Sequence, residues 1–169
     1  MVRSRFESDA PVVVGIQIAD LRVPAAVRNA SGSPAILDCE FTLRPDEFNS
    51  DSGLVVKWFF NNGPAPVYQW IPGQKPQELG ILKGRLNVSH RASDNHATMH
   101  RALYIVNPTT ELSGDYKCFV STFGDEDFMT KRMVVFAMRK SKADGLINKP
   151  LAYLPVNEPD AIFYFSGYA

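Results

Sequence analysis

The 169-residue sequence has few cysteines, few histidines and no excess of charge of either sign. Lys plus Arg and Asp plus Glu both total 18, so the chain lacks the positive field that holds nucleic acid or an anionic membrane surface. No apolar run approaches the roughly 18 residues of a membrane-spanning helix. The two cysteines have no histidine at ligand spacing, which is a poor basis for a zinc site. We therefore expect no nucleic-acid binding, no direct membrane insertion by this chain and no cofactor.

The sequence also lacks the motifs that assemble common catalytic sites. It contains no Gly-x-Ser-x-Gly, no Gly-x-x-x-x-Gly-Lys and no His-Glu-x-x-His, so no nucleophile, base and orienting group can be assigned. His96 and His100 are four residues apart, but they fall in a predicted loop without a third ligand. We expect that the protein is not an enzyme.

What the sequence does contain is a set of short apolar runs separated by turn-forming residues. Apolar residues make up 45% and charged residues 21%, as in a soluble domain with a packed core. Neither an internal repeat nor a helical period is present, and this spacing is typical of an all-β domain. The predicted strands are Leu21–Val27, Ala35–Phe41, Leu54–Phe60, Val67–Ile71, Arg85–Ser89, Ala102–Val106, Gly114–Thr122 and Met129–Met138.

The domain is expected to span residues 18–139. Within it, Asn61-Asn62-Gly63 tolerates positive φ and predicts a hairpin between the third and fourth strands. Residues 1–17 are expected to be a poorly ordered segment and only a weak signal-peptide candidate. Residues 140–169 are expected to be a tail or linker without its own fold; the alternative is a docking peptide formed by Phe163, Tyr164, Phe165 and Tyr168.

Cys39, Trp58, Tyr116 and Cys118 decide the predicted fold. The cysteines lie 79 positions apart in two predicted strands, with Trp58 between them and Tyr116 two residues before the second. This pattern is typical of an immunoglobulin-like β-sandwich, in which a tryptophan packs on the disulfide and the tyrosine hydroxyl bonds back to the backbone. The extra run Val67–Ile71 predicts the additional strand of a variable-type domain. Two buried free thiols are the alternative to the bridge.

Four longer segments carry a family resemblance. They are Val56-Lys57-Trp58-Phe59-Phe60-Asn61-Asn62, the run from Val67 to Gln77, Leu82-Lys83-Gly84-Arg85-Leu86, and the stretch from His100 through Asn107-Pro108-Thr109 to Ser121-Thr122-Phe123. Together they resemble the first domain of the beaten path-like proteins of arthropod nervous systems. The resemblance covers about residues 18–139 and implies a secreted or membrane-attached recognition protein that acts in axon guidance and cell adhesion. It also implies a sidestep-type cell-surface immunoglobulin protein as partner.

Strand alternation predicts a partner-binding face. With Trp58 and Cys118 inward, a period of two points their sequence neighbours outward on adjacent strands. Aromatic anchors rimmed by charge are typical of protein contacts. The predicted contact residues are Lys57, Phe59, Lys117, Phe119 and Ser121, joined by Tyr68 and Trp70 if these point outward rather than covering a small satellite core.

The turn before the last strand carries Asp125, Glu126 and Asp127, which we expect to tune partner choice. A solvated turn and a calcium site are alternatives, although the spacing is not that of an EF-hand loop. Asn29 and Asn87 begin glycosylation sequons and are expected to carry sugars in an exported glycoprotein.

A rival function is a soluble immune-type or small-ligand binder. It would use the long loop before Leu54 and the acidic turn, and it would need a deep apolar cavity of several hundred Å³.

Overall fold

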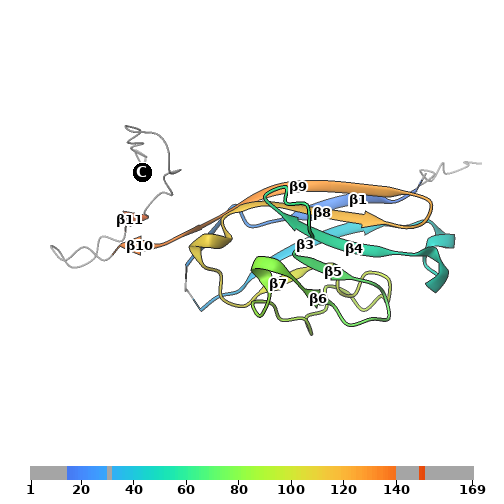
Figure 1. Cartoon of the computed structure of the whole chain (residues 1–169), viewed down its shortest axis with the longest axis horizontal. Coiled ribbons are helices and arrows are strands. Elements are labelled where there is room, and N and C mark those ends of the chain that lie inside the picture. The colour runs from blue at the N-terminus through green and yellow to red at the C-terminus, as the bar shows by residue number, and fades with distance from the viewer. Residues whose placement is uncertain (1–14, 30–31, 140–148, 151–169) are drawn as a thin grey trace, which may run out of the picture.

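The computed structural model describes residues 15–29, 32–139 and 149–150, and these residues form strands and short 3-10 turns (Figure 1). The prediction of an all-β protein is confirmed, because the described ranges contain no α-helix. None of these residues forms a helix long and apolar enough to cross a membrane. The strands are β1 (Gln17–Arg22), β2 (Ala26–Arg28), β3 (Ala35–Thr42), β4 (Val55–Phe60), β5 (Tyr68–Trp70), β6 (Gln77–Glu78), β7 (Leu103–Ile105), β8 (Gly114–Ser121), β9 (Glu126–Phe136), β10 (Met138–Arg139) and β11 (Lys149–Pro150). The 3-10 turns are η1 (Pro45–Glu47), η2 (Ser50–Ser52), η3 (Gly80–Leu82) and η4 (Thr110–Leu112).

Two sheets enclose the core. One has the strand order β1-β3-β7 and the other the order β2-β9-β8-β4-β5-β6, while β10 and β11 form a separate pair. Neighbouring strands are antiparallel except β2 and β9, which run parallel. The buried residues of β3 (Ala35, Leu37, Cys39, Phe41) face those of β8 (Gly114, Tyr116, Cys118, Val120), so the predicted alternation is confirmed on both sheets.

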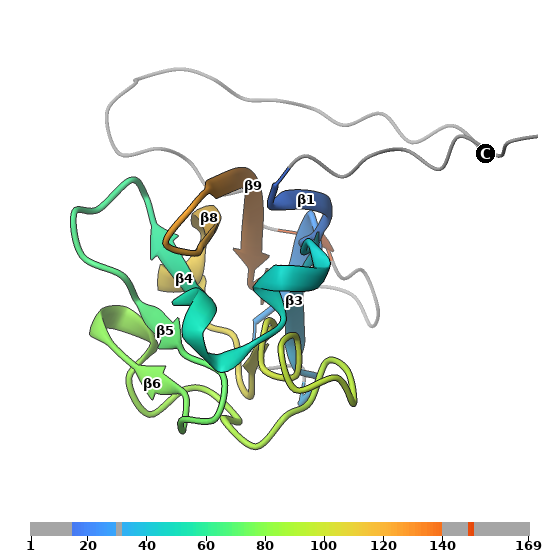
Figure 2. The ribbon, with the colours of Figure 1, turned by 90° about the vertical axis from the view of Figure 1, so that its right-hand side faces the viewer.

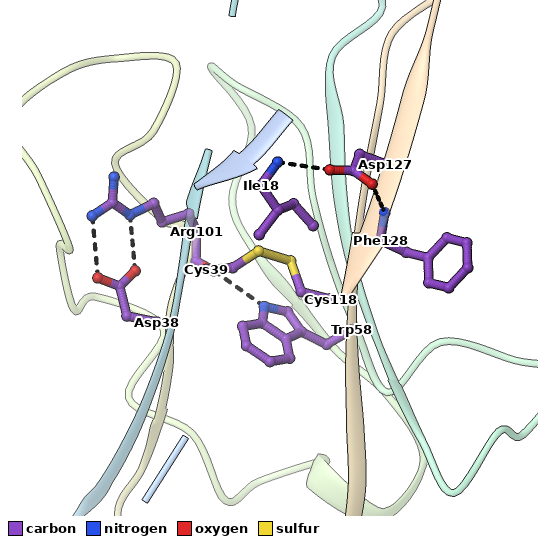
Figure 3. The surroundings of a disulfide bond; sticks show 8 residues. All are labelled: Ile18, Asp38, Cys39, Trp58, Arg101, Cys118, Asp127 and Phe128. Atoms are coloured by element: carbon purple, nitrogen blue, oxygen red, sulfur yellow. Dashed lines mark hydrogen bonds and ion pairs between the residues drawn. A yellow bond between two sulfur atoms is a disulfide. The ribbon is translucent and has the colours of Figure 1, made fainter. Parts of the chain in front are cut away.

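A disulfide between Cys39 and Cys118 joins the two sheets across the core (Figure 3). The bridge is therefore present as predicted, and the Cα atoms of the two cysteines are 6.4 Å apart. Trp58 lies opposite Cys118 in the β4–β8 register and is fully buried. The Tyr116 hydroxyl donates to the Leu112 carbonyl at 2.8 Å, which confirms the predicted corner before β8.

The Trp58 indole is held by a contact that the sequence did not predict. Its Nε1 donates to the Arg101 carbonyl at 3.1 Å, while the Arg101 guanidinium makes two bonds to the Asp38 carboxylate at 2.8 and 3.1 Å (Figure 3). Both charged side chains are largely buried. The Arg101–Asp38 pair joins the segment before β7 to β3. The carbonyl that accepts the indole hydrogen bond belongs to this segment, so its position is fixed relative to the sheet.

The β4–β5 hairpin forms as predicted. Asn61 and Asn62 both have positive φ, at 50° and 54°, and the Gly63 amide donates to the Phe60 carbonyl at 2.9 Å. The Asn61 side chain also accepts a hydrogen bond from the Asp115 amide at 2.9 Å. The turn is thereby attached to β8, and this attachment fixes the end of the face described below.

Two predicted strands need correction. The run Leu21–Val27 divides between the sheets, because Pro24 has no amide for a ladder and β1 and β2 lie on either side of it. Arg85–Ser89 is not a regular strand: Leu86 forms a single bridge to Ile105, and the side chain of Asn87 accepts the Ser89 amide and ends the pairing. β6 was not predicted.

The described fold begins before the predicted boundary at residue 18. Ile16 is buried in the core and β1 starts at Gln17. The four aromatic residues of the alternative docking peptide, Phe163, Tyr164, Phe165 and Tyr168, lie outside the described residues.

Candidate protein-interaction face

Three strands of the larger sheet place phenylalanine and lysine side chains side by side on its outer surface. The antiparallel register sets Lys117 of β8 opposite Phe59 of β4. It also sets Phe119 of β8 between Lys57 on one side and Phe128 of β9 on the other. Because directly opposite residues point to the same side of a sheet, all five side chains share the outer face. The predicted outward direction of the β4 and β8 residues agrees with this register.

The aromatic rings on this face contact one another and a lysine. Phe59 and Phe119 meet edge to face with ring centroids 6.4 Å apart. The Lys117 ammonium lies 4.7 Å from the Phe59 centroid and 5.7 Å from the Phe128 centroid. Such cation–π contacts contribute about 0.5–1 kcal/mol each at exposed sites, so they hold the side chains in a defined arrangement. We refer to Phe59, Phe119, Phe128 and Lys117 as the phenylalanine cluster.

Phe128 is the most exposed ring of the cluster, with an exposed fraction of 61%. It was not among the contact residues predicted from the sequence. Figure 3 shows its ring on the side of β9 away from the disulfide. The predicted strand began at Met129, whereas β9 begins at Glu126. The signal was nevertheless present, because Met133 and Val135 are buried and a period of two from them leaves Phe128 on the opposite face.

Tyr68 and Trp70 do not belong to this face, and their inclusion in the predicted contact set is wrong. Each is only 2% exposed. The register explains why: Tyr68 pairs with Trp58 and Trp70 pairs with Val56, both of which point inward. The Tyr68 hydroxyl donates to the His100 carbonyl at 2.6 Å, and burial raises the pKa of this hydroxyl above its ordinary value. The outward residue of β5 is Gln69, the partner of Lys57.

Two lysines, Lys57 and Lys117, add positive charge to the face. Neither Lys57 nor Lys117 has a carboxylate within ion-pair distance among the described residues. At one end of the face, by contrast, Arg132 of β9 pairs with Asp115 of β8 at 3.0 Å. Ser121 lies toward the other end, opposite the exposed Glu126. Cationic side chains beside the exposed Phe128 ring and two half-buried rings can contact a surface with carboxylates and apolar groups.

Asp127 of the acidic turn makes structural contacts that the sequence did not predict. One oxygen of its carboxylate accepts the Ile18 amide and the other accepts the Phe128 amide, both at 2.8 Å (Figure 3). Asp127 therefore ties β1 to β9. Asp125 accepts the Glu126 amide at 2.8 Å, and Glu126 is left exposed at the edge of the face. Within residues 15–29, 32–139 and 149–150, no three acidic, histidine or cysteine side chains gather as a metal site.

The two sequon asparagines differ in accessibility. Asn87 is exposed and lies beside β7, since its amide donates to the Tyr104 carbonyl at 2.9 Å. Asn29 is half-buried and its side-chain oxygen is enclosed. β7 belongs to the sheet opposite the phenylalanine cluster, so a sugar on Asn87 would leave the candidate face clear.

The 3-10 turns η1 and η2 and the turn between β8 and β9 lie at the same end of the sandwich (Figure 2). Residues of these segments line a separate hollow. Its volume is about 250 Å³, and its lining includes Phe48, Leu54, Ile71 and Phe123. Two of the segments that line it, the loop before Leu54 and the β8–β9 turn, are those that the sequence assigned to the rival function. The sequence did not place Ile71 or His96 there.

No protein-family model matches the chain, and no curated protein matches it in sequence. Solved structures do match. A Drosophila OTK structure of extracellular domains 3–5 superposes with a TM-score of 0.50 at 10% identity, over 75% of this chain and 39% of that one. The human B7-H4 IgV-like domain gives 0.48 at 17% identity, covering 71% of this chain and 95% of that chain. An amphioxus IgVJ-C2 molecule superposes with a TM-score of 0.46 at 21% sequence identity. The superposition covers 65% of this chain and 55% of that one.

The fold class rests on the disulfide, the buried Trp58, the Tyr116 corner and the strand order, together with the superposition on the Drosophila OTK domains. The presence of β5 beside β4 adds the extra strand that distinguishes the variable type. The chain forms a variable-type immunoglobulin-like β-sandwich.

Proposed function

We propose that this domain is an extracellular recognition module that binds a partner protein through the outer face of β9, β8, β4 and β5. The observation that carries the proposal is the phenylalanine cluster, in which the exposed Phe128 and the half-buried Phe59, Phe119 and Lys117 contact one another on the outer face rather than in the core. Aromatic side chains surrounded by polar ones are the usual anchors of protein interfaces.

The cluster is organised before any partner arrives. The edge-to-face rings and the bridging ammonium restrict rotamers that would otherwise have to be fixed on binding. Each immobilised flexible side chain costs about 0.5–1.5 kcal/mol at an interface, so a pre-ordered lysine favours association. The Lys117 ammonium can then pair with a carboxylate of the partner. This attraction would speed the encounter of the two proteins and fix their relative orientation.

The disulfide supports an exported protein. Disulfides persist in oxidising compartments and are rare in the reducing cytosol. The exposed sequon asparagine, Asn87, suits the same compartment. We therefore propose a secreted or cell-surface localisation. The sequence resemblance to the beaten path-like proteins supports the finer proposal of a sidestep-type immunoglobulin partner and a role in neuronal cell recognition, adhesion and axon guidance.

The rival small-ligand function receives less support. Pockets for small molecules typically have volumes of about 300–1,000 Å³. The hollow between η1, η2 and the β8–β9 turn is smaller, at about 250 Å³. A recognition module instead needs an open face with an apolar centre, which is what the phenylalanine cluster provides.

Alanine substitution tests the proposal. Phe59→Ala, Phe119→Ala and Phe128→Ala should each weaken binding to an immobilised sidestep-type ectodomain by about 1–3 kcal/mol, or about 5- to 150-fold in Kd. Ile36→Ala is the matched control, because Ile36 is an exposed apolar residue of β3 on the opposite sheet. Circular dichroism before and after heating checks that each variant folds. Normal binding by all three phenylalanine variants, with loss of binding by Ile36→Ala, would refute the proposed face.

A further inference from the structure

The outer surface of the β1-β3-β7 sheet carries apolar residues that the proposed partner face does not use. Ile36 is 43% exposed and Val106 is 51% exposed, although both are large apolar residues. The half-buried Tyr104 lies directly opposite Ile36, so their side chains are neighbours on this surface. The Val106 amide donates to the Arg85 carbonyl at 3.0 Å, so the extended pairing continues past β7 and places Val106 on the same side as Tyr104. We refer to Ile36, Tyr104 and Val106 as the β7 patch.

Asn87, the first residue of a glycosylation sequon, lies across Tyr104 from Ile36. Leu86 forms an antiparallel bridge with Ile105. Ile105 is fully buried and Leu86 packs against the core. The next pair is Asn87 and Tyr104, and the Asn87 amide donates to the Tyr104 carbonyl at 2.9 Å. Because neighbouring residues alternate in direction, Asn87, Tyr104 and Ile36 form one row across the outer surface.

A local turn holds the Asn87 side chain by its oxygen. Its Oδ1 accepts the Ser89 amide at 3.1 Å, and the His90 amide donates to the Asn87 carbonyl at 3.1 Å. The Nδ2 atom, to which an N-linked sugar is attached, has no hydrogen-bond partner among the described residues. Asn87 and Ser89 are both exposed, so the two defining residues of the sequon are accessible.

The same turn brings a second ring against Tyr104. The ring centroids of His90 and Tyr104 are 5.0 Å apart, and the ring planes are tilted by 44°. The turn from Asn87 to His90 thus folds back toward β7, and the contact restricts the Tyr104 ring. A sugar attached at Asn87 meets an aromatic surface that needs little further ordering.

We propose that Asn87 carries an N-linked glycan whose first N-acetylglucosamine packs on Tyr104 and covers the β7 patch. This inference rests on the export proposed above, and it uses none of the residues of the phenylalanine cluster. The Cβ atoms of directly opposite residues lie about 4.5–5.5 Å apart, so the first sugar begins beside the Tyr104 side chain. One side of a pyranose ring presents C–H groups that pack on aromatic and aliphatic surfaces, while its hydroxyls stay in water. The covered apolar surface is removed from water, which stabilises the folded domain.

The glycan gives the two sheets different roles. The outer surface of the β1-β3-β7 sheet takes carbohydrate attached to the same chain, and the bulk of that carbohydrate keeps other proteins away from it. The phenylalanine cluster lies on the other sheet and stays open to a protein partner.

Hydroxyl-radical footprinting of protein secreted behind a supplied signal peptide tests this proposal. Ser89→Ala removes the sequon but keeps the backbone amide that binds the Asn87 oxygen, while Ser89→Thr keeps both and is the matched control. Glycopeptide analysis should find Asn87 occupied in the unaltered chain and in Ser89→Thr. Oxidation of the β7 patch should be several-fold higher in Ser89→Ala than in these two proteins. Oxidation of Phe128, which is exposed on the other sheet, should be equal in all three.

Two further measurements identify the sugar and the ring that make the contact. An endoglycosidase that leaves a single N-acetylglucosamine on Asn87 should leave the β7 patch protected. Ser89→Ala should lower the melting temperature by a few degrees in the unaltered chain but not in a Tyr104→Ala background, because the ring that the sugar contacts is then absent.

Equal oxidation of the β7 patch in the glycosylated chain and in Ser89→Ala would overturn the proposal, as would an unoccupied Asn87 in the secreted folded protein. Loss of protection after trimming to one sugar would also overturn it, because the outer sugars would then be the cover. None of these measurements includes a partner protein. A failure here is therefore distinct from a failure of the phenylalanine cluster to bind a sidestep-type ectodomain.

Discussion

Removal of the disulfide should cost the domain a large part of its stability. The bridge closes a loop with a sequence separation of 79. In the chain-entropy relation, a loop of this length corresponds to about 4.5 kcal/mol of stabilisation through the unfolded state. Both cysteines are fully buried, so truncation to alanine also leaves space beside Trp58 and adds to the loss. The total free energy of unfolding of a native domain is about 5–15 kcal/mol, so this loss would be a large part of it.

The measurement is urea unfolding of the Cys39→Ala/Cys118→Ala variant, followed by tryptophan fluorescence and circular dichroism. With a urea m-value of about 1–3 kcal/mol/M, a loss near 4.5 kcal/mol lowers the midpoint by about 1.5 M or more, and a marginally stable domain unfolds without urea. The matched control is the unaltered chain reduced with a thiol. A loss below about 1 kcal/mol in both samples would refute the reasoning, as would two alkylatable thiols in the exported folded protein.

Three further predictions follow from single residues. Tyr116→Phe removes the hydrogen bond to the Leu112 carbonyl and should cost about 1–2 kcal/mol in urea unfolding; an unchanged midpoint would contradict this. Burial raises the pKa of the Tyr68 and Tyr116 hydroxyls in the folded state. Stability should therefore fall as the pH rises above the tyrosine pKa of the unfolded chain, near 10, because only the unfolded state then loses these protons. Thermal melting measured as a function of pH tests this prediction, and a melting temperature that does not change over this range would exclude it. Secretory expression should add glycans at Asn87 and Asn29, and an unchanged mass after glycosidase treatment would disprove this.

The sequence was sufficient for the core because the core depends on short-range patterns. A period of two around Cys39 and Cys118 placed their inward neighbours correctly, and Trp58 and Tyr116 added two positions with a known packing role. The same period placed Phe59 outward beside its β8 neighbours. Wherever one anchored residue set the parity of its strand, the predicted direction agreed with the structure.

The errors arose where parity or position depended on contacts distant in sequence. The direction of Tyr68 is set by its pairing with Trp58 across a hairpin whose loop length alone does not define the register. The sequence pattern places Asp127 in an acidic turn, whereas in the structure it belongs to β9 and accepts the amide of Ile18, 109 residues earlier. Reading that segment as a turn also hid Phe128. The contributions of Ile71 and His96 to the hollow beside η1 and η2 could not be predicted, because the hollow joins four separate segments of the chain.

Hydroxyl-radical footprinting of the free protein and of its complex with a sidestep-type ectodomain tests whether the partner binds the outer face of β9, β8, β4 and β5. The side chains to compare are Phe128, which is 61% exposed on the candidate face, and Ile36 and Val106, which are 43% and 51% exposed elsewhere. If this face binds the partner, complex formation should reduce the oxidation of Phe128 several-fold and leave the oxidation of Ile36 and Val106 unchanged. Unchanged oxidation of Phe128 in a saturated complex, with protection of Ile36, would contradict it.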